Sequence, residues 1–495
     1  MYNDIPLSDI DGLMKRSWEA FRSYRARPLK DRARLMRTIA DELENAGDEL
    51  IFTAMRETNL PEARLRGERA RTIFQLSSYA DACEKGDWMD IRIDTADSQR
   101  NPPRPDIRKM MRPLGPVLVY GASNFPFAYS TAGGDTACAL AAGCSVVVKA
   151  HPAHPATSLL AAEAIGRAIY RCGLPEDVFL HVFGRTTEVG EALVTHPCTR
   201  AVGFTGSYVA GKALFDWAAK RKVPIPVFSE MGSVNPVFLL PEKLSGEAAD
   251  IARMYAASIT LGAGQFCTNP GLIIGVEGPA LDDFMAELGT AISGIGSAPM
   301  LHAGIAAAYT EKKTLALSQD GARLVATGTG TDDAIKGVPA IASVDGKHFL
   351  QNPVLHQEVF GPYSLVVRCK DIQEMHTVAE SMEGQLTATM MATPSDVQAH
   401  PELIPLIEEC CGRVIMNGVP TGVEVCLAMH HGGPFPATTD SRFSSVGADG
   451  IRRFARPVSY QNWPDELLPE ELKNDNPLHI MRTVNNEPGR NSIVA

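Results

Sequence analysis

The chain has 495 residues, of which 45% are hydrophobic and 21% are charged, and its formal net charge at pH 7 is −11. This length predicts two or three domains, and the negative charge argues against nonspecific binding to nucleic acid. The ten cysteines show neither disulfide-framework nor zinc-type spacing, which is typical of free thiols in a reducing cytoplasm. Neither a signal-peptide pattern nor an apolar run of about eighteen residues occurs, so we expect a cytoplasmic protein without a membrane anchor.

Helical patterns dominate residues 7–85, where apolar residues recur at spacings of three and four. The segment after Pro61 is rich in arginine, and such a helix face is normally solvated. Alternatively, Arg69 or Arg71 points inward and pairs with a carboxylate, for which the guanidinium fork is suited. Residues 86–113 then alternate between polar and apolar and predict an exposed β-hairpin, a feature that often serves assembly.

From residue 116 onward, short apolar strands alternate with helices, which predicts parallel sheets with right-handed crossovers. Ligands bind such sheets at the carboxyl ends of the strands. Gly206 and Ser207 occupy one strand-to-helix turn, where free backbone N–H groups suit a pyrophosphate. The turn lacks the glycine fingerprint of dinucleotide sites, so an ordinary helix cap is the alternative interpretation.

Two reactive side chains stand near the ends of further elements. Glu230 closes an apolar strand, and apolar surroundings would raise the pKa of its carboxyl group toward that of a useful base. Cys267 lies in a glycine-rich turn between a helix-like segment, 252–260, and a strand-like one, 272–276. A thiolate there would be a strong nucleophile if its pKa were lowered, whereas a free cysteine is more commonly a buried, inert thiol.

Six short motifs follow one another along the chain, at residues 121–126, 148–149, 204–207, 230–232, 264–267 and 358–362. In this order they resemble the aldehyde dehydrogenase superfamily over nearly the whole chain. The resemblance implies an α/β fold with a Rossmann-like parallel-sheet cofactor domain, a second α/β catalytic domain and a small β oligomerisation extension. We expect the cofactor domain at 1–85 and 114–232 with part of 430–460, the catalytic domain at 233–429, and the extension at 86–113 and 461–495. The extension implies a homodimer or homotetramer.

The resemblance implies three catalytic residues. Cys267 would be the nucleophile that attacks an aldehyde, and Asn124, together with the backbone N–H of Cys267, would bind the resulting alkoxide. Two such donors stabilise the developing charge, and loss of one typically costs about 10²–10³ in rate. Glu230 would activate water to hydrolyse the thioester, so its presence favours a free carboxylic acid as the product.

The resemblance also implies a nicotinamide cofactor. The residues expected to contact it are Lys149 at the adenosine ribose, Gly206 and Ser207 at the pyrophosphate, and Glu358 and Phe360 at the nicotinamide ribose. The family pattern Pro-Ser-Glu after the lysine is replaced by Ala-His-Pro at 150–152, so the carboxylate that would accept the adenosine 2′-OH is missing. A 2′-phosphate is then not repelled, and Arg185 could pair with it unless it is an ordinary surface arginine. We therefore expect NADP as the cofactor, with NAD possible.

Residues 121–128, 149–155 and 457–464 resemble one branch of the superfamily. This branch contains 2-oxoglutarate semialdehyde (2,5-dioxopentanoate) dehydrogenases and NADP-dependent fatty-aldehyde dehydrogenases. We expect the oxidation of 2-oxoglutarate semialdehyde to 2-oxoglutarate, as in sugar-acid catabolism, with Arg69 or Arg71 pairing with the substrate carboxylate. A dehydrogenase of fatty aldehydes, which would need an apolar tunnel, is the alternative.

A catalytically silent binding or structural protein is an alternative from another class. Such a protein would not need the nucleophile, the oxyanion donor, the base and the nucleotide lysine together, which argues against it. We also expect no metal centre. The adjacent His430 and His431 have no carboxylate or cysteine at ligand spacing in the sequence, and the chemistry of the family uses no metal.

Overall fold

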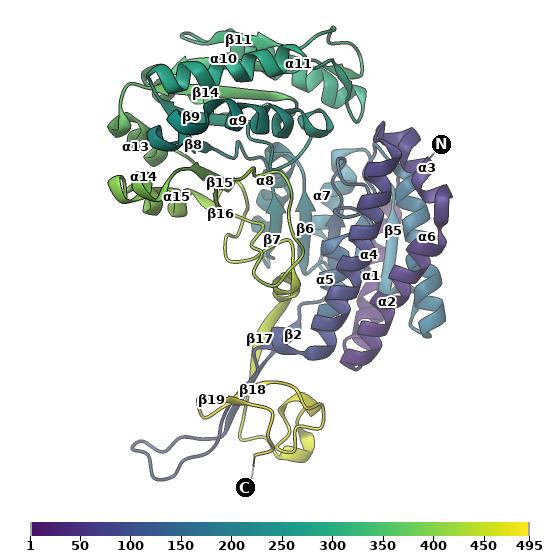
Figure 1. Ribbon diagram of the computed structural model, residues 1–495. Coiled ribbons are helices and arrows are strands. Elements are labelled where there is room, and N and C mark those ends of the chain that lie inside the picture. The colour runs from purple at the N-terminus through teal and green to yellow at the C-terminus, as the bar shows by residue number, and fades with distance from the viewer. Residues whose placement is uncertain (1, 494–495) are drawn as a thin grey trace.

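The structure is a computed structural model that describes residues 2–493 (Figure 1). Its N-terminal part is helical, as the sequence predicts. Apolar residues at helical spacing form the buried faces, and Pro28 and Pro61 directly precede two of the helices, where a missing N–H group breaks no helical hydrogen bond. The helices are α1 (Leu7–Tyr24), α2 (Leu29–Asn45), α3 (Gly47–Thr58) and α4 (Glu62–Lys85).

The first sheet has five strands, all parallel, in the order β5-β4-β3-β6-β7. Because β3 pairs with both β4 and β6, the strand order reverses at β3, and the carboxyl ends of these strands form a crevice suited to a ligand. The predicted parallel sheet with helical crossovers is confirmed. The strands are β3 (Val117–Tyr120), β4 (Val146–Lys149), β5 (Phe179–Val182), β6 (Ala201–Thr205) and β7 (Val227–Glu230), and the helices are α5 (Gly134–Ala142), α6 (Pro155–Cys172), η2 (Glu176–Val178), α7 (Thr187–Thr195) and α8 (Tyr208–Ala219).

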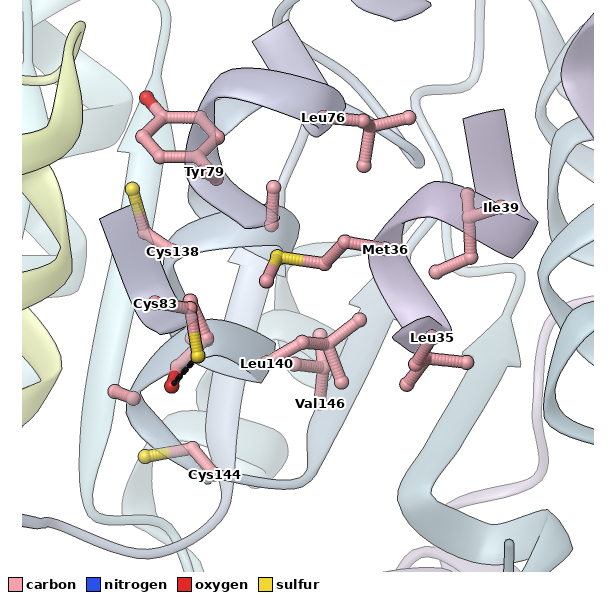
Figure 2. Packing of buried hydrophobic residues seen from close by; sticks show 14 of the residues in the cluster. Leu35, Met36, Ile39, Leu76, Tyr79, Cys83, Cys138, Leu140, Cys144 and Val146 are labelled. Atoms are coloured by element: carbon pink, nitrogen blue, oxygen red, sulfur yellow. Dashed lines mark hydrogen bonds between the residues drawn. The ribbon is translucent and has the colours of Figure 1, made fainter. Parts of the chain in front are cut away.

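A hydrophobic core joins the N-terminal helices to this first sheet. Figure 2 shows Met36 of α2 packed with Leu140 of α5 and Val146 of β4. Cys83 of α4 lies in the same core, where its Sγ is 3.4 Å from the carbonyl oxygen of Ala141. Burial raises the pKa of Cys83 to about 12, so this thiol is an inert part of the core.

The second α/β unit is built on a seven-stranded sheet of order β11-β13-β14-β9-β8-β15-β16. Its strands are parallel except that β11 runs antiparallel to β13. Helices pack on this sheet. The second unit, drawn in teal and green, lies beside the first unit (Figure 1). The strands are β8 (Val237–Leu239), β9 (Leu272–Val276), β11 (Arg323–Thr327), β13 (Ala340–Asp345), β14 (Tyr363–Cys369), β15 (Gln385–Met391) and β16 (Cys411–Met416), and β10 (Ala298–Pro299) pairs separately with β12 (Lys336–Gly337). The helices are α9 (Pro241–Thr260), η3 (Leu261–Gly264), α10 (Pro279–Ser293), α11 (Ala303–Leu317), α12 (Gly346–Gln351), η4 (Pro353–His356), α13 (Ile372–Glu380), α14 (Pro394–Ala399) and α15 (Leu403–Cys410).

A third sheet, of order β17-β2-β1-β18-β19, projects away from both α/β units (Figure 1). The structure differs from the prediction in two details here. Residues 87–89 form a short 3-10 helix rather than the start of a strand, because Trp88 and Met89 turn into the core. The third sheet takes up the chain at Ala455, where β17 begins, whereas the second part of the extension was expected from 461; β17 pairs with the whole of β2. The elements are η1 (Asp87–Met89), β1 (Arg92–Asp94), β2 (Ile107–Pro113), η5 (Ala448–Phe454), β17 (Ala455–Gln461), η6 (Asp465–Leu467), η7 (Glu470–Leu472), β18 (Arg482–Val484) and β19 (Glu487–Gly489).

Membrane crossing needs a long, apolar helix, and none of the helices within residues 2–493 has both properties.

Candidate active site

A cleft of about 500 Å³ lies where the carboxyl ends of the first sheet face the second α/β unit. Residues from both units line it, so the two halves of the chain must fold together to form the cleft. Seven of the residues singled out from the sequence are among the lining residues: Asn124, Gly206, Ser207, Glu230, Cys267, Glu358 and Phe360.

The backbone conformation of the Cys267 loop requires glycine at position 264. Gly264 has a φ of 65°, and a Cβ there would collide with the backbone of Gly361, so glycine is required for this close approach. Nδ2 of Asn235 donates hydrogen bonds of 2.9 Å to the carbonyl oxygens of Cys267 and Asn269. The loop is therefore fixed from both sides, and Cys267 stands half-buried in the cleft.

The electrostatics of Cys267 differ from the lowered pKa that a ready nucleophile needs. Burial, with the nearby carboxylates of Glu230 and Glu358, holds the pKa of the Cys267 thiol well above its ordinary value. In the unliganded protein the sulfur is therefore protonated at neutral pH. A base or an added positive charge must act on it before it can attack a carbonyl carbon.

Glu230 is 3% exposed at the end of β7, but its surroundings are polar rather than apolar. Its Oε1 accepts a hydrogen bond from Nε2 of His431 at 3.0 Å, and its Oε2 accepts one from the hydroxyl of Ser445 at 2.6 Å. Burial raises the pKa of the Glu230 carboxyl group, but its attraction to His431 and the hydrogen bonds from His431 and Ser445 outweigh burial and lower the pKa overall. Glu230 is thus an ionised carboxylate at neutral pH, which can accept a proton.

His431 is not assigned a catalytic role from the sequence alone. It is 1% exposed, and its Nε2 lies 3.7 Å from Sγ of Cys267 as well as 3.0 Å from Glu230. The sequence suggests this histidine only as a metal ligand, because Glu230 and Cys267, which lie near it in space, are far away in the sequence. A histidine in a glycine-rich stretch was the only local signal.

The reason given against a metal at His431 is corrected by the structure. One donor atom each of Glu230, Cys267 and His431 lies within 4.8 Å of the other two. The carboxylate and the cysteine absent from the sequence neighbourhood are therefore present in space. The 3.0 Å separation of Nε2 and Oε1 is that of a hydrogen bond, which accounts for the arrangement without a metal ion.

Asn124 follows β3 and directs its side chain toward the Cys267 loop. Its Nδ2 donates to the carbonyl oxygen of Gln265 at 3.1 Å, which leaves its second N–H free for a further acceptor. The backbone carbonyl oxygen of Asn124 accepts a hydrogen bond of 2.7 Å from Nη2 of Arg64. The Arg64 guanidinium lies 4.8 Å from the ring centroids of both Phe125 and Phe266, so it fixes the two loops that hold Asn124 and Cys267.

The residues expected at the nucleotide lie along the edge of the first sheet. Ser207 caps α8, and its hydroxyl accepts from the N–H of Ala210 at 3.4 Å, so the helix N-terminus faces the cleft. Gly206 must be glycine because a Cβ there would lie 2.6 Å from the ring of Phe204. Nζ of Lys149 donates to the carbonyl oxygen of Gly184 at 2.7 Å, and burial lowers its pKa. A helix N-terminus and a glycine turn after β6 and a lysine at the end of β4 thus lie along one edge of the sheet, which suits a dinucleotide.

Glu358 and Phe360 reach the cleft from the second unit. Burial raises the pKa of the Glu358 carboxyl group to about 7. A Cβ on Gly232 would lie 2.6 Å from Oε2 of Glu358, so this glycine makes room for the carboxylate. Nζ of Lys312 donates to the backbone carbonyl oxygen of Glu358 at 3.0 Å, and Lys312 lines the same cleft.

The three arginines named from the sequence have different places. Arg185 is exposed after β5 and lies outside the cleft lining, where its backbone N–H donates to Asp4. Arg69 is corrected as a substrate candidate, because its guanidinium is bound to the carbonyl oxygen of Gly47 and to Glu44 and it does not line the cleft. Arg71 points inward, where it donates from Nη1 to the carbonyl oxygen of Val423.

Known proteins resemble the chain in sequence and in fold. The model of the aldehyde dehydrogenase family matches residues 3–436. Alpha-ketoglutaric semialdehyde dehydrogenase 2 of Azospirillum brasilense is 47% identical over 96% of this chain and 91% of its own length. Alpha-ketoglutaric semialdehyde dehydrogenase of Acinetobacter baylyi is 45% identical over 98% of this chain and 92% of its own length.

A solved structure shares the fold at much lower identity. Glyceraldehyde-3-phosphate dehydrogenase of Methanocaldococcus jannaschii, complexed with NADP, superposes with a TM-score of 0.78 at 19% identity, over 93% of this chain and 95% of that one. The fold, the family model and the two relatives agree with one another. The chain therefore belongs to the aldehyde dehydrogenase family, and it is an aldehyde-oxidising oxidoreductase that uses a nicotinamide cofactor.

Proposed function

We propose that this enzyme oxidises 2-oxoglutarate semialdehyde to 2-oxoglutarate. The observation that carries the proposal is the 47% and 45% identity to two alpha-ketoglutaric semialdehyde dehydrogenases, each matched over more than nine-tenths of its length. The cleft supports it, because a nucleophile, a base and an oxyanion donor meet there. These residues also weigh against a catalytically silent protein.

In the first half of the reaction Sγ of Cys267 attacks the aldehyde carbon, and the thiol proton passes to the pair of His431 and Glu230, which releases it to solvent before the second half. The carbonyl oxygen becomes an alkoxide, which the free N–H of Asn124 and the backbone N–H of Cys267 stabilise. A bound nicotinamide cofactor would supply a positive charge near Cys267 and would take up the hydride from the former aldehyde carbon. That carbon and Sγ of Cys267 are then joined as a thioester.

In the second half water attacks the thioester carbon, and Glu230 accepts a proton from that water. The hydrogen bonds from His431 and Ser445 hold both oxygens of Glu230, so the carboxylate keeps one orientation through the cycle. The carbon–sulfur bond breaks, the carboxylic acid leaves, and Cys267 regains its proton. A hydrolysing enzyme requires a base held close to the thioester sulfur, and one donor atom of Glu230 and one of Cys267 lie within 4.8 Å of each other.

We propose NADP as the preferred cofactor, with NAD also used. Pro152 stands where a carboxylate would repel a 2′-phosphate, and Lys149 with Arg185 provides positive charge at this edge of the sheet. Replacement of Arg185 by Ala is expected to raise the KM for NADP by about 10-fold and to leave the KM for NAD unchanged. An equal change in both constants would contradict the assignment.

We further propose that the third sheet assembles the chain into a homodimer or homotetramer in the cytoplasm. This sheet projects from both α/β units, and its strands β17 and β19 are edges that a second copy can cover (Figure 1). The ten cysteines are all free, as in a reducing compartment. Light scattering of the purified protein tests the assembly, and a monomer would contradict it.

Steady-state kinetics test the substrate. The semialdehyde is expected to exceed hexanal in kcat/KM by about 100-fold, because hexanal offers no carboxylate to the enzyme's cations. A preference for hexanal would instead favour a fatty-aldehyde dehydrogenase.

A further inference from the structure

Two arginines from different α/β units meet at one loop beside the catalytic residues. Arg71 of α4 donates to the carbonyl oxygen of Val423, and Arg413 of β16 donates from Nη1 to that of Gly422 at 2.9 Å. A second bond, from Nη2 of Arg413 to the carbonyl oxygen of Pro420, is 2.6 Å long. The loop at 420–423 therefore holds both guanidinium groups in fixed positions.

Both guanidinium groups keep N–H groups without an acceptor. Nε and Nη2 of Arg71 and Nε of Arg413 are buried and have no hydrogen-bond partner. In Arg71 the two free atoms share one edge of the guanidinium plane, which is the edge that can give two parallel N–H bonds to a carboxylate. A buried donor without a partner is costly, so these three atoms point to a ligand that would satisfy them.

The positive charge of the two arginines is also unbalanced. Within residues 2–493, neither Arg71 nor Arg413 forms an ion pair with a carboxylate; their bonds go to backbone carbonyl groups. Glu68, one turn before Arg71 on α4, uses its Oε1 for the N–H groups of Phe127 and Ala128. Burial raises the pKa of Glu68 to about 7, so its charge compensates the arginines incompletely.

Tyr129 stands between the catalytic residues and the two arginines in its interactions. The ring of Tyr129 stands 6.2 Å from that of His431, and charges on Arg71, Glu230 and Cys267 all act on its hydroxyl. The charges of Tyr129 and Cys267 likewise act on Arg413. Neither arginine lines the cleft that faces the first sheet's strand ends. We infer that an aldehyde bound at Cys267 and extending past Tyr129, away from the cofactor cleft, would reach the two arginines.

We propose that Arg71 and Arg413 form a carboxylate subsite that binds the 2-oxo acid end of the substrate while its aldehyde end lies at Cys267. The inference rests on the proposed function, because only a substrate with a carboxylate remote from its aldehyde uses such a site. Arg71 gives the two-bond edge, and Arg413 adds a third N–H and a second positive charge. The pair selects semialdehydes of short oxo acids over uncharged aldehydes of equal length.

The test compares 2-oxoglutarate semialdehyde with pentanal, which has the same number of carbon atoms and no carboxylate. In R71M we expect kcat/KM for the semialdehyde to fall about 10- to 100-fold, and kcat/KM for pentanal to change less than about 3-fold. R413M is expected to act in the same direction. R71K, which keeps the charge and loses the two-bond edge, should recover part of the loss. R69M is the matched control, because Arg69 lies on the same helix and binds Gly47 and Glu44 instead.

The outcomes separate the inference from the function on which it rests. If the wild type prefers the semialdehyde but R71M loses activity on both substrates equally, the arginines only hold the 420–423 loop, and the subsite is wrong. If the wild type prefers pentanal, the proposed function itself is wrong and the subsite falls with it. Binding of the product 2-oxoglutarate, measured by calorimetry, is an independent readout: its Kd should rise about 10- to 100-fold in R71M and stay constant in R69M.

Discussion

The two sides of Cys267 are built in different ways. On the cofactor side, Lys149 ends β4 and Ser207 follows β6, so the parallel strand order alone brings them to one edge of the first sheet. On the substrate side, Arg71 and His431 come from a helix and a loop that are far apart in the sequence. The first side is a product of topology, and the second of tertiary packing.

This difference has a chemical counterpart. The cofactor side presents backbone N–H groups and a helix N-terminus, which bind phosphate whatever the neighbouring side chains are. The substrate side presents charged side chains whose protonation and partners decide the reaction: Glu230 is held ionised, Cys267 is held protonated, and Arg71 has free donors. Substitutions on the two sides of Cys267 should therefore impair the enzyme in different ways.

The largest effect is expected from Cys267, which faces both sides. C267A removes the only atom that forms a covalent bond to the substrate, so kcat should fall by about 10⁴-fold or more. Cofactor binding, followed by fluorescence, should be unchanged, because hydrogen bonds from the Asn235 side chain to backbone carbonyl oxygens hold the loop. Residual turnover near the wild-type rate would exclude the covalent mechanism.

E230Q tests the base on the substrate side. It should slow hydrolysis of the thioester by about 10²- to 10⁴-fold and hydride transfer in the first turnover by much less, because solvent can also take the thiol proton. Stopped-flow absorbance should then show a burst of reduced cofactor near one equivalent per site, followed by slow turnover. D440N is the control, because Asp440 is paired with Arg442 outside the Glu230 hydrogen bonds. A linear time course without a burst would assign Glu230 to an earlier step.

H431Q tests how Glu230 is kept ionised. Without the attraction of His431, burial should raise the pKa of the Glu230 carboxyl group, so the acid limb of the kcat profile should move to higher pH. At neutral pH the loss should be about 10- to 100-fold and should shrink as the pH rises. S445A, which removes the weaker partner, should shift the limb in the same direction by less. A pH-independent loss would show that His431 has a different task.

The sequence allowed prediction of the parts that local pattern and strand topology determine. The parallel first sheet follows from apolar strands that alternate with helices, and Gly206 and Ser207 fall at a strand-to-helix turn in any such fold. The hairpin at β1 and β2 follows from its alternation. The short helix at 87–89 was not predictable, because burial of Trp88 against other elements decides it.

The residues on the substrate side could not be predicted from the sequence, for a physical reason. His431 reaches Glu230 across 201 residues of sequence, and no local rule links the two. The pKa of Glu230 depends on those partners rather than on its own strand, so the apolar strand alone does not show in which direction the pKa shifts. The choice between Arg69 and Arg71, two residues apart on α4, depends on which face of the helix meets the 420–423 loop.

The smallest effect is expected on the cofactor side, at Glu358. Its pKa of about 7 means that the carboxylate loses its charge as the pH falls through neutrality, and a protonated carboxyl group is a weaker acceptor for the ribose hydroxyls. The KM for the cofactor should therefore rise a few-fold, about 3- to 10-fold, between pH 8 and pH 6 in the wild type. In E358Q it should be high and independent of pH, whereas E311Q, an exposed change on α11, should keep the wild-type profile. Because Glu358 contacts no substrate in this scheme, the kcat/KM ratio of semialdehyde to pentanal should stay constant in E358Q. A changed ratio would mean that the two sides of Cys267 are not independent.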